Sequence, residues 1–550
     1  MHQSQTDWSR RLILKVFERG QSLPTHWSRA YPAPVFATLF VFVFLLHLPL
    51  LRLPYFWDEA GYYVPAARDI LLSGSLIPHS TLSNAHPPLV MAWLALWWKV
   101  VGYTPVVTRT AMLFLAAFSL VGVFRLAEVV ANSRVAIAAT LCTAVYPVFF
   151  AQSSLAQVDL TAAGLIFWGL SAYIEERKLA TILWFSLAAL AKETAILAPL
   201  ALAVWELVGF LAQRTSCSKL WRFDDTRPLR VILLLIPAIP LAFWYAYHYA
   251  RMGYVFGNPE FFRYNVASTL SPTRFVLALI MRLWQISGYL HLWVLTLGML
   301  LALWMLPPLR DSTSERPRIS IPVQMIFYVV IGTYVVAMAL IGGAVLARYM
   351  LPAIPLIIIV SVSTLWRRVE WWPAAIAFVV LAFVTAWFWN PPYGFSPEDN
   401  LAYRDYIVLH ENSEQFLEAR YPMARVLTAW PASDELTRPW LGYITRPMSI
   451  VRIEDFSLDE ILSSADFRSH YDVALIFSTK YEPGPTRWDH WRAWTDLKTK
   501  FFGFHRDLPP AAVAHILGGH IVFSQERQGQ WVAVIEMQQS EIQNAEVRMQ

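Results

Sequence analysis

Residues 321–343 read IPVQMIFYVVIGTYVVAMALIGG, a stretch that contains no Asp, Glu, Lys or Arg. At about 1.5 Å per residue, a helix of this length can cross the roughly 30 Å hydrocarbon core of a bilayer. The rest of the chain has a similar character. Apolar residues make up 56% of the 550 residues and charged residues 15%, whereas soluble chains carry about 25% charged residues. This composition excludes soluble, fibrous and disordered classes and indicates a polytopic membrane protein.

Apolar stretches of roughly crossing length recur through the first 390 residues. There are eleven: 33–51, 106–124, 135–150, 159–174, 179–190, 194–211, 231–248, 288–306, 321–343, 349–366 and 371–389. One more run, 89–104, follows His86-Pro87-Pro88, carries Lys99 and is rich in Trp. A short, Trp-rich helix that starts at proline suits the membrane interface as well as the interior.

The distribution of basic residues decides where 89–104 lies. With 89–104 on the surface, the segments on the N-terminal side of the membrane hold 19 Lys and Arg in 81 residues, and the opposite segments hold 10 in 113. Short basic loops stay in the cytoplasm. We therefore expect about eleven transmembrane helices, a cytoplasmic segment 1–32, and an external loop 52–109 that contains juxtamembrane helices.

The charge changes sign where the apolar stretches end. Residues 1–390 hold 29 Lys and Arg against 17 Asp and Glu, a net charge of +12, whereas residues 391–550 hold 15 against 22, a net charge of −7. We therefore expect a membrane domain over 33–390 and an external, soluble α/β domain over 391–550. Within the latter, the pattern predicts a helix over 398–419 and strands at 425–430, 449–453, 473–477, 520–524 and 530–537, the last two forming a hairpin.

The first external loop carries two adjacent acids, Asp58 and Glu59, among aromatic residues. A carboxylate at a membrane surface can take a proton from an acceptor hydroxyl, and general-base chemistry needs only one that is well placed. The alternative is structural, because acids are also favoured in the first turn of a helix. The residues alone leave both interpretations open.

Charged groups also lie at the ends of apolar stretches on the same face. Asp159 starts one stretch and can be an acceptor-side acid or an N-terminal cap. Lys192 and Arg348 can bind a phosphate or anchor helix ends at the lipid headgroups. Other cations near this face are Arg52, Arg68, Lys99, Arg109, Arg251, Arg263, Arg274 and Arg282. Together, a base in one loop and cations at several helix ends are what transfer from a lipid-linked phosphate donor requires.

Several of these residues fall in motifs that resemble a known family. The chain is similar to GT-C glycosyltransferases and, more narrowly, to glycosyltransferase family 39, the group of protein O-mannosyltransferases and lipid A aminoarabinose transferases, in a bacterial member. The likeness covers about residues 33–366, and its motifs stand in the family's order. They are Trp57-Asp58-Glu59-Ala60-x-Tyr62, His86-Pro87-Pro88-Leu89, Gln157-Val158-Asp159-Leu160, Ala189-Leu190-Ala191-Lys192-Glu193, Gly257-Asn258-Pro259 and Arg348-Tyr349-Met350-Leu351-Pro352.

The resemblance implies an inverting glycosyltransferase of the bacterial inner membrane that uses a polyprenyl-phosphate sugar on the external, periplasmic face. It implies that Asp58, with Glu59, supplies the catalytic acids and that Asp58 is the base. The donor phosphate would meet Lys192, Arg348, Tyr349 and His86, and Asp159 and Tyr62 would line the acceptor or sugar side. The aminoarabinose transferases carry Lys where this chain has His86.

The implied partners are the lipid-linked donor, membrane lipids and an acceptor that is a protein, a lipid or a glycan, with no nucleic acid. The sequence implies no cofactor and leaves open whether a divalent metal takes part. Two other functions also fit a polytopic chain. A secondary transporter places charges at the membrane midplane and often shows internal repeats, whereas these acids lie in a loop. A non-catalytic lipid-binding envelope protein would not require Asp58, Lys192 and Arg348 to converge.

Overall fold

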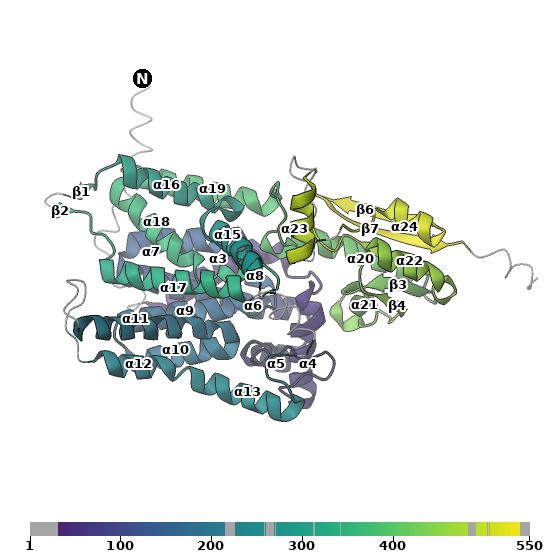
Figure 1. The fold of residues 1–550 in the computed structure, drawn as a ribbon, viewed down its shortest axis with the longest axis horizontal. Helices are drawn as coiled ribbons and strands as arrows, with labels where there is room; N and C mark the ends of the chain where they lie inside the picture. Colours follow the sequence, from purple (N-terminus) through teal and green to yellow (C-terminus); the bar gives the residue numbers. More distant parts are fainter. Residues whose placement is uncertain are drawn as a thin grey trace, which may run out of the picture.

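The computed structural model describes residues 31–538 except 215–225, 258, 260–268, 270, 312–313, 342, 482–490, 503 and 505. Segment 1–32 therefore lies almost entirely outside the described residues, as does Asn258 of the Gly257-Asn258-Pro259 motif. Figure 1 shows a bundle of long helices with a smaller α/β domain at one end. The α/β domain is formed by the C-terminal part of the chain.

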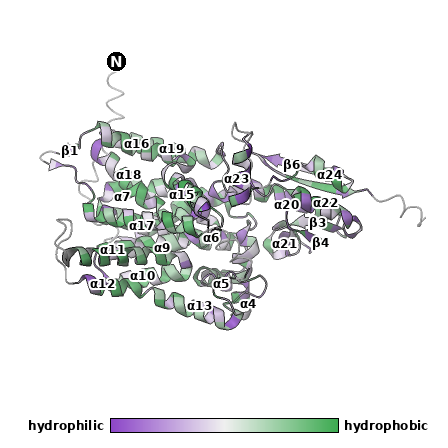
Figure 2. Ribbon diagram, viewed as in Figure 1, coloured by the Kyte–Doolittle hydropathy of each residue, from purple (hydrophilic) through white to green (hydrophobic). Residues whose placement is uncertain are grey.

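Each of the eleven apolar stretches forms helix. Many of these helices begin with proline, whose missing N–H costs nothing in the first turn, and hydrophobic residues dominate them (Figure 2). They are α3 (Pro32–His47), α6 (Pro105–Val130), α7 (Ser133–Val145), α8 (Pro147–Ser154), α9 (Asp159–Ile174), α10 (Lys178–Ala191), α11 (Leu197–Arg214), α12 (Arg227–Leu235), α13 (Ala238–Met252), α16 (Leu292–Met305), α17 (Ile321–Leu340), α18 (Ile354–Arg368) and α19 (Trp372–Phe388). A further helix, α15 (Pro272–Ser287), lies outside the eleven stretches.

The chain is a multi-pass membrane protein. Among the described residues, six helices are long and apolar enough to cross a membrane, or seven if the bent pair α7 and α8 is one span. The axis bends by 68° between α7 and α8, where Pro147 cannot continue the helical hydrogen bonding. Other apolar helices, including α9, α10 and α19, are shorter, and the predicted number of eleven crossings stays a prediction.

The loop over residues 52–109 folds into short helices. A π-helical turn, η3 (Glu59–Tyr63), leads into α4 (Val64–Ser73), and α5 (Leu89–Val101) follows. The 13 residues of α5 span about 20 Å, less than the hydrocarbon core of a bilayer. The loop therefore has the short helices expected of a juxtamembrane segment.

The C-terminal domain is built on one mixed sheet in the order β4-β3-β5-β7-β6. Strands β3 (Arg425–Ala429), β4 (Ser449–Ile453) and β5 (Val473–Phe477) pair in parallel, and β7 (Gln530–Met537) joins β5 to β6 (Gly519–Arg527) through antiparallel ladders. The hairpin turns at Gln528 and Gly529, which both have positive φ. The predicted sheet and hairpin are confirmed, and β6 is longer than predicted because its ladder with β7 continues to Arg527.

Four helices complete this domain: α20 (Ala402–Arg420), α21 (Ala432–Glu435), α22 (Leu458–Asp466) and α24 (Pro510–Leu517); a fifth, α23 (Arg492–Phe502), lies near the bundle in Figure 1. The predicted helix over 398–419 is wrong at its start. Residues Pro397–Asp399 form a 3-10 turn, η8, and Asn400 is extended before α20 begins. This break directs Glu398 toward the helical bundle.

Candidate active site

Asp58 lies on a strained turn in the loop over residues 52–109, directly before η3. Trp57 before it has φ +41°, a left-handed conformation that a bulky residue adopts only when its surroundings enforce it. The indole of Trp57 packs edge-on against Trp430 at 5.0 Å and Tyr406 at 5.6 Å. Asp58 precedes η3, but its side chain makes no capping hydrogen bond to that turn. Its carboxylate binds another partner instead.

That partner is Arg348, which joins segments far apart in the chain. Arg348 lies in a 3-10 turn, η7 (Ala347–Met350), and its side chain is only 4% exposed. Its Nη2 donates to Asp58 Oδ2 at 2.6 Å, and its Nη1 donates to Gln157 Oε1 at 2.5 Å and to Glu398. Its Nε lies 3.5 Å from Asp159 Oδ2. The guanidinium thus connects the first loop, the start of α9 and the C-terminal domain.

Asp159 and Lys192 form the second ion pair of the site. Asp159 is the first residue of α9, and its Oδ2 has no hydrogen-bond partner among the described residues. Its Oδ1 instead accepts from Lys192 Nζ at 2.5 Å. Lys192 is the residue that ends α10, and its backbone is extended. Its Nζ also lies 4.2 Å from the centre of the Tyr349 ring.

Tyr349 is a common neighbour of three cations. Besides Lys192, the guanidinium of Arg282 lies 5.5 Å and that of Arg348 5.6 Å from its ring centre. Cations within about 6 Å of an aromatic face are attracted to it. The ring therefore gathers positive charge next to Asp58 and Asp159.

Arg282 differs from the other two cations because no carboxylate lies within ion-pair distance of it in the described part of the chain, although the charge of Asp399 acts on it from farther away. It is fully buried on α15, and its bonds go to Gln285 Oε1 at 2.9 Å and to the carbonyls of Leu346 at 2.7 Å and Met338 at 3.3 Å. Its Nη2 has no hydrogen-bond partner in the described part of the chain. A buried cation without an anion is costly, because its charge is desolvated and uncompensated.

Glu59 faces away from this cluster, although it follows Asp58 directly. Its Oε1 accepts from Arg109 and from the Ala156 N–H at 2.5 Å, and its Oε2 accepts from the Phe56 N–H at 2.8 Å. Neither Glu59 nor Arg109 is more than 1% exposed. The two acids predicted together are thus separated, since only Asp58, with 34% of its side chain exposed, contacts Arg348 and solvent.

His86 and Tyr62 line the neighbouring wall. His86 Nδ1 lies 3.0 Å from Glu193 Oε2, and its ring packs edge-on against Tyr62 at 5.6 Å. Because Glu193 follows Lys192, this pair holds the turn between α10 and η4 (Glu193–Ile196). His86 therefore pairs with an acid, Glu193.

Two acids that the sequence did not single out enter the site from the C-terminal domain. Glu398 also accepts from Gln157 Nε2 at 2.9 Å, and Asp399 Oδ2 accepts from the Tyr289 hydroxyl at 2.6 Å. Burial and the neighbouring Glu398 carboxylate together raise the pKa of Asp399 to about 8, although the hydrogen bond from Tyr289 opposes the shift. No local pattern predicts these contacts, because η8 meets the site only through tertiary folding.

Charge accounts for the state of Arg348. Burial by itself lowers its pKa, but the carboxylates of Glu398, Asp58 and Asp159 outweigh burial and hold the pKa well above its ordinary value. The guanidinium is therefore permanently charged, and Asp58 is oriented by a fixed cation.

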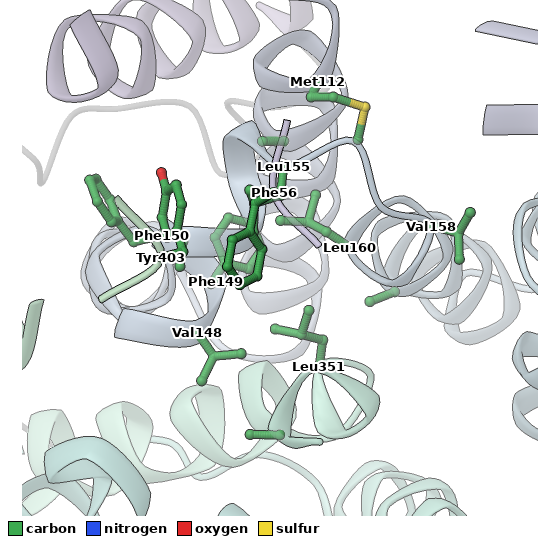
Figure 3. Close-up of a cluster of buried hydrophobic side chains, with 14 of the residues drawn as sticks. Phe56, Met112, Val148, Phe149, Phe150, Leu155, Val158, Leu160, Leu351 and Tyr403 are labelled. Carbon is green, nitrogen blue, oxygen red and sulfur yellow. The ribbon is translucent and has the colours of Figure 1, made fainter. Parts of the chain in front are cut away.

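An apolar cluster fixes the backbone behind these side chains (Figure 3). Phe56 precedes the Trp57-Asp58 turn, Val158 and Leu160 flank Asp159, and Leu351 ends the η7 turn, and all four are buried. Because interiors pack as densely as organic crystals, these neighbours restrict the motion of each charged group. The site is a preorganised ion network on a rigid base.

No protein-family model matches the sequence, and no curated protein matches it. Solved structures do match. ArnT from Cupriavidus metallidurans bound to undecaprenyl phosphate aligns with a TM-score of 0.52 and 15% identity over 91% of this chain and 98% of that chain. Its apo state gives a TM-score of 0.48 and 15% identity over 92% and 98%. The Archaeoglobus fulgidus oligosaccharyltransferase complex with Zn and sulfate gives 0.42 and 12% over 80% and 67%. The ArnT likeness shows that this chain has a GT-C-like fold.

Proposed function

We propose that this protein is a membrane glycosyltransferase that moves a sugar from a polyprenyl-phosphate donor to an acceptor hydroxyl. The observation that carries the proposal is one network, in which a partly exposed carboxylate, Asp58, is joined through Arg348 and Tyr349 to Arg282, a buried cation that forms no ion pair with the described residues. Such a transfer requires a base that accepts the hydroxyl proton and a cation that binds the leaving phosphate, and Asp58 and Arg282 are placed to supply them. The related fold of an ArnT bound to undecaprenyl phosphate supports this choice of donor.

In the proposed reaction, Asp58 takes the proton of the acceptor hydroxyl as the oxygen attacks the anomeric carbon of the donor sugar. The bond between that carbon and the phosphate oxygen breaks, and the electron pair leaves with the phosphate. The products are the glycosylated acceptor and polyprenyl phosphate, with the proton on Asp58. In-line displacement inverts the anomeric carbon.

The phosphate is proposed to lie against Tyr349, within reach of the three cations around that ring. Lys192 and Arg348 already face acids, so Arg282 gains most from an added anion. At this position the phosphate can leave without being protonated, because the cations stabilise its negative charge. Asp159 then orients Lys192 and shapes the sugar side together with Tyr62.

The remaining site residues take positioning roles in this proposal. Glu59 holds the first loop to the α8–α9 turn through Arg109, and His86 holds the Lys192-Glu193 turn. Neither is placed to accept the hydroxyl proton, since Glu59 is fully buried and His86 pairs with Glu193.

We further propose the topology that the basic loops indicate: eleven crossings, a cytoplasmic N-terminus, and both the site and domain 391–550 on the periplasmic side of a bacterial inner membrane. Glu398 bonds to Arg348, so the site and the C-terminal domain share one side of the membrane. A soluble domain on the external side would keep the acceptor and the site in the same compartment.

The test is release of free polyprenyl phosphate by the purified protein in lipid, supplied with a panel of polyprenyl-phosphate monosaccharides and a cell-envelope extract. Mass spectrometry of the products identifies donor and acceptor. Asp472→Asn is the matched control for Asp58→Asn, because it removes a carboxylate from an Arg pair, with Arg425 at 3.1 Å, away from the site. We expect release that Asp58→Asn abolishes and Asp472→Asn preserves. No release from any donor by folded protein would favour a non-catalytic lipid-binding protein.

A further inference from the structure

A second buried polar cluster lies in the C-terminal domain, apart from the proposed active site. It consists of His410 and Glu414, one turn apart on α20, and Glu435 at the end of α21. Their side chains are 1%, 0% and 0% exposed. Two carboxylic acids are thus enclosed in the domain interior beside one histidine.

The three side chains converge on one point. His410 Nδ1 lies 2.7 Å from Glu435 Oε2 and 3.7 Å from Glu414 Oε1, and one ligand atom of each residue lies within 4.8 Å of the others. Ligand atoms around a tetrahedral Zn²⁺ are about 3.3 Å apart, given bonds of about 2.0 Å. The spacing is that of a small ion's coordination shell.

The acids lack the partners that buried carboxylates need. Both oxygens of Glu414 and Oε1 of Glu435 are buried without a hydrogen-bond partner among the described residues. No Lys or Arg pairs with either acid within the described part of the chain. Burying an unpaired carboxylate costs free energy, and a bound cation would offset that cost.

We propose that His410, Glu414 and Glu435 hold one divalent transition-metal ion, with Zn²⁺ as the ion that best fits the donor set. Two carboxylates and a neutral imidazole balance the charge of a dication. One nitrogen and two carboxylates are typical ligands of Zn²⁺, whereas Ca²⁺ takes six to eight oxygens and Mg²⁺ keeps several waters.

The ion would fix the wall behind the proposed base. The Tyr406 ring stacks on His410 at 4.0 Å and contacts Trp57 at 5.6 Å, and Trp57 precedes Asp58. Trp430, just before α21, contacts Trp57 from the other side. A metal that joins α20 to α21 therefore holds both aromatic residues that enforce the Trp57 turn. We assign the ion a structural role.

The test uses the full-length protein in detergent, purified without chelator. Elemental analysis after dialysis against metal-free buffer should find one Zn²⁺, Fe²⁺ or Mn²⁺ per chain. Glu414→Gln and Glu435→Gln should each lose it, and Glu411→Gln, which changes a neighbouring half-buried acid on the same helix, should retain it. Chelation should lower the melting temperature of the wild type by about 5 to 10 °C, as expected for loss of a tight ligand, and added Zn²⁺ should restore it.

A wild-type protein that is folded, contains no metal and shows no change in melting temperature with Zn²⁺ or chelator would overturn the proposal. In that case Glu414 and Glu435 share a proton. If the Gln variants do not fold, the chelation and Zn²⁺ titration of the wild type still decides. The outcome is independent of the proposed transferase activity, because none of these residues belongs to the site around Arg348.

Discussion

Asp58 and Glu59 are neighbours in sequence, yet the structure predicts opposite consequences for Asp58→Asn and Glu59→Gln. Asp58 is one-third exposed and bonds to Arg348 at 2.6 Å. A hydrogen bond to a charged group contributes about 1.5–3 kcal/mol, and solvent exposure reduces this to about 1 kcal/mol. Arg348 keeps Gln157 and Glu398. Asp58→Asn should therefore fold normally and lose activity by a factor of about 100 to 10,000.

Glu59→Gln should behave in the opposite way. Glu59 is inaccessible and compensates the buried charge of Arg109. Removing one partner of a buried ion pair costs about 3–5 kcal/mol, a large part of the roughly 5–15 kcal/mol that stabilises a folded domain. We expect a marked fall in melting temperature and in the yield of folded protein, with any loss of activity following the loss of fold.

Two measurements on the same preparations check the pair: thermal unfolding in detergent, and release of polyprenyl phosphate per folded molecule. An Asp58→Asn protein that turns over near the wild-type rate would contradict the assignment of Asp58 as the base. A Glu59→Gln protein that melts within a degree of the wild type would show that the buried pair contributes nothing to stability.

Three other predictions test separate parts of the structure. Arg282→Gln should raise the KM for the donor about tenfold or more. It should also lower the melting temperature, because it removes the donor to the buried Leu346 and Met338 carbonyls, so KM is measured on the folded fraction; unchanged donor kinetics would move the phosphate elsewhere. The raised pKa of Asp399, about 8 against 3.8, means that the stability contributed by the protonated acid is complete below about pH 4 and is lost as pH rises to about 8, by up to about 1.4 kcal/mol per pH unit. Melting temperatures should therefore fall from about pH 5 to 8 and level off above about pH 8 in the wild type, and stay flatter in Asp399→Asn; identical slopes would contradict the shift. Gly61→Ala would place a methyl group 2.6 Å from the Trp430 ring and should cost about 1–3 kcal/mol in thermal unfolding, whereas Gly332→Ala meets nothing within 4 Å and should be neutral or stabilising.

Much of the architecture could be predicted from local pattern. Crossing helices need long apolar stretches, and a fully buried strand needs only a short apolar run, so the stretch 321–343 and the strand Val473–Phe477 could be predicted without any tertiary information. The start of α20 was not. Residues 398–401 have acceptable helical spacing, but Glu398 is held by Arg348 and Gln157 in a 3-10 turn outside the helix.

The separation of Asp58 from Glu59 was equally beyond a sequence argument. Adjacent side chains on a helical turn point about 100° apart, so one can meet Arg348 while the other meets Arg109. Which one faces solvent depends on the packing around Trp57, not on the residues themselves.

The sequence by itself determined the membrane character, the change from a basic to an acidic half, and the residues Asp58, Asp159, Lys192 and Arg348, because hydropathy and charge are properties of the chain. The tertiary structure decided which of them meet. It brought Glu398 into the site, left Arg282 without an ion pair among the described residues, and enclosed His410, Glu414 and Glu435 together. The physical reason is that electrostatic energy depends on distance and burial, and neither is written in the order of residues.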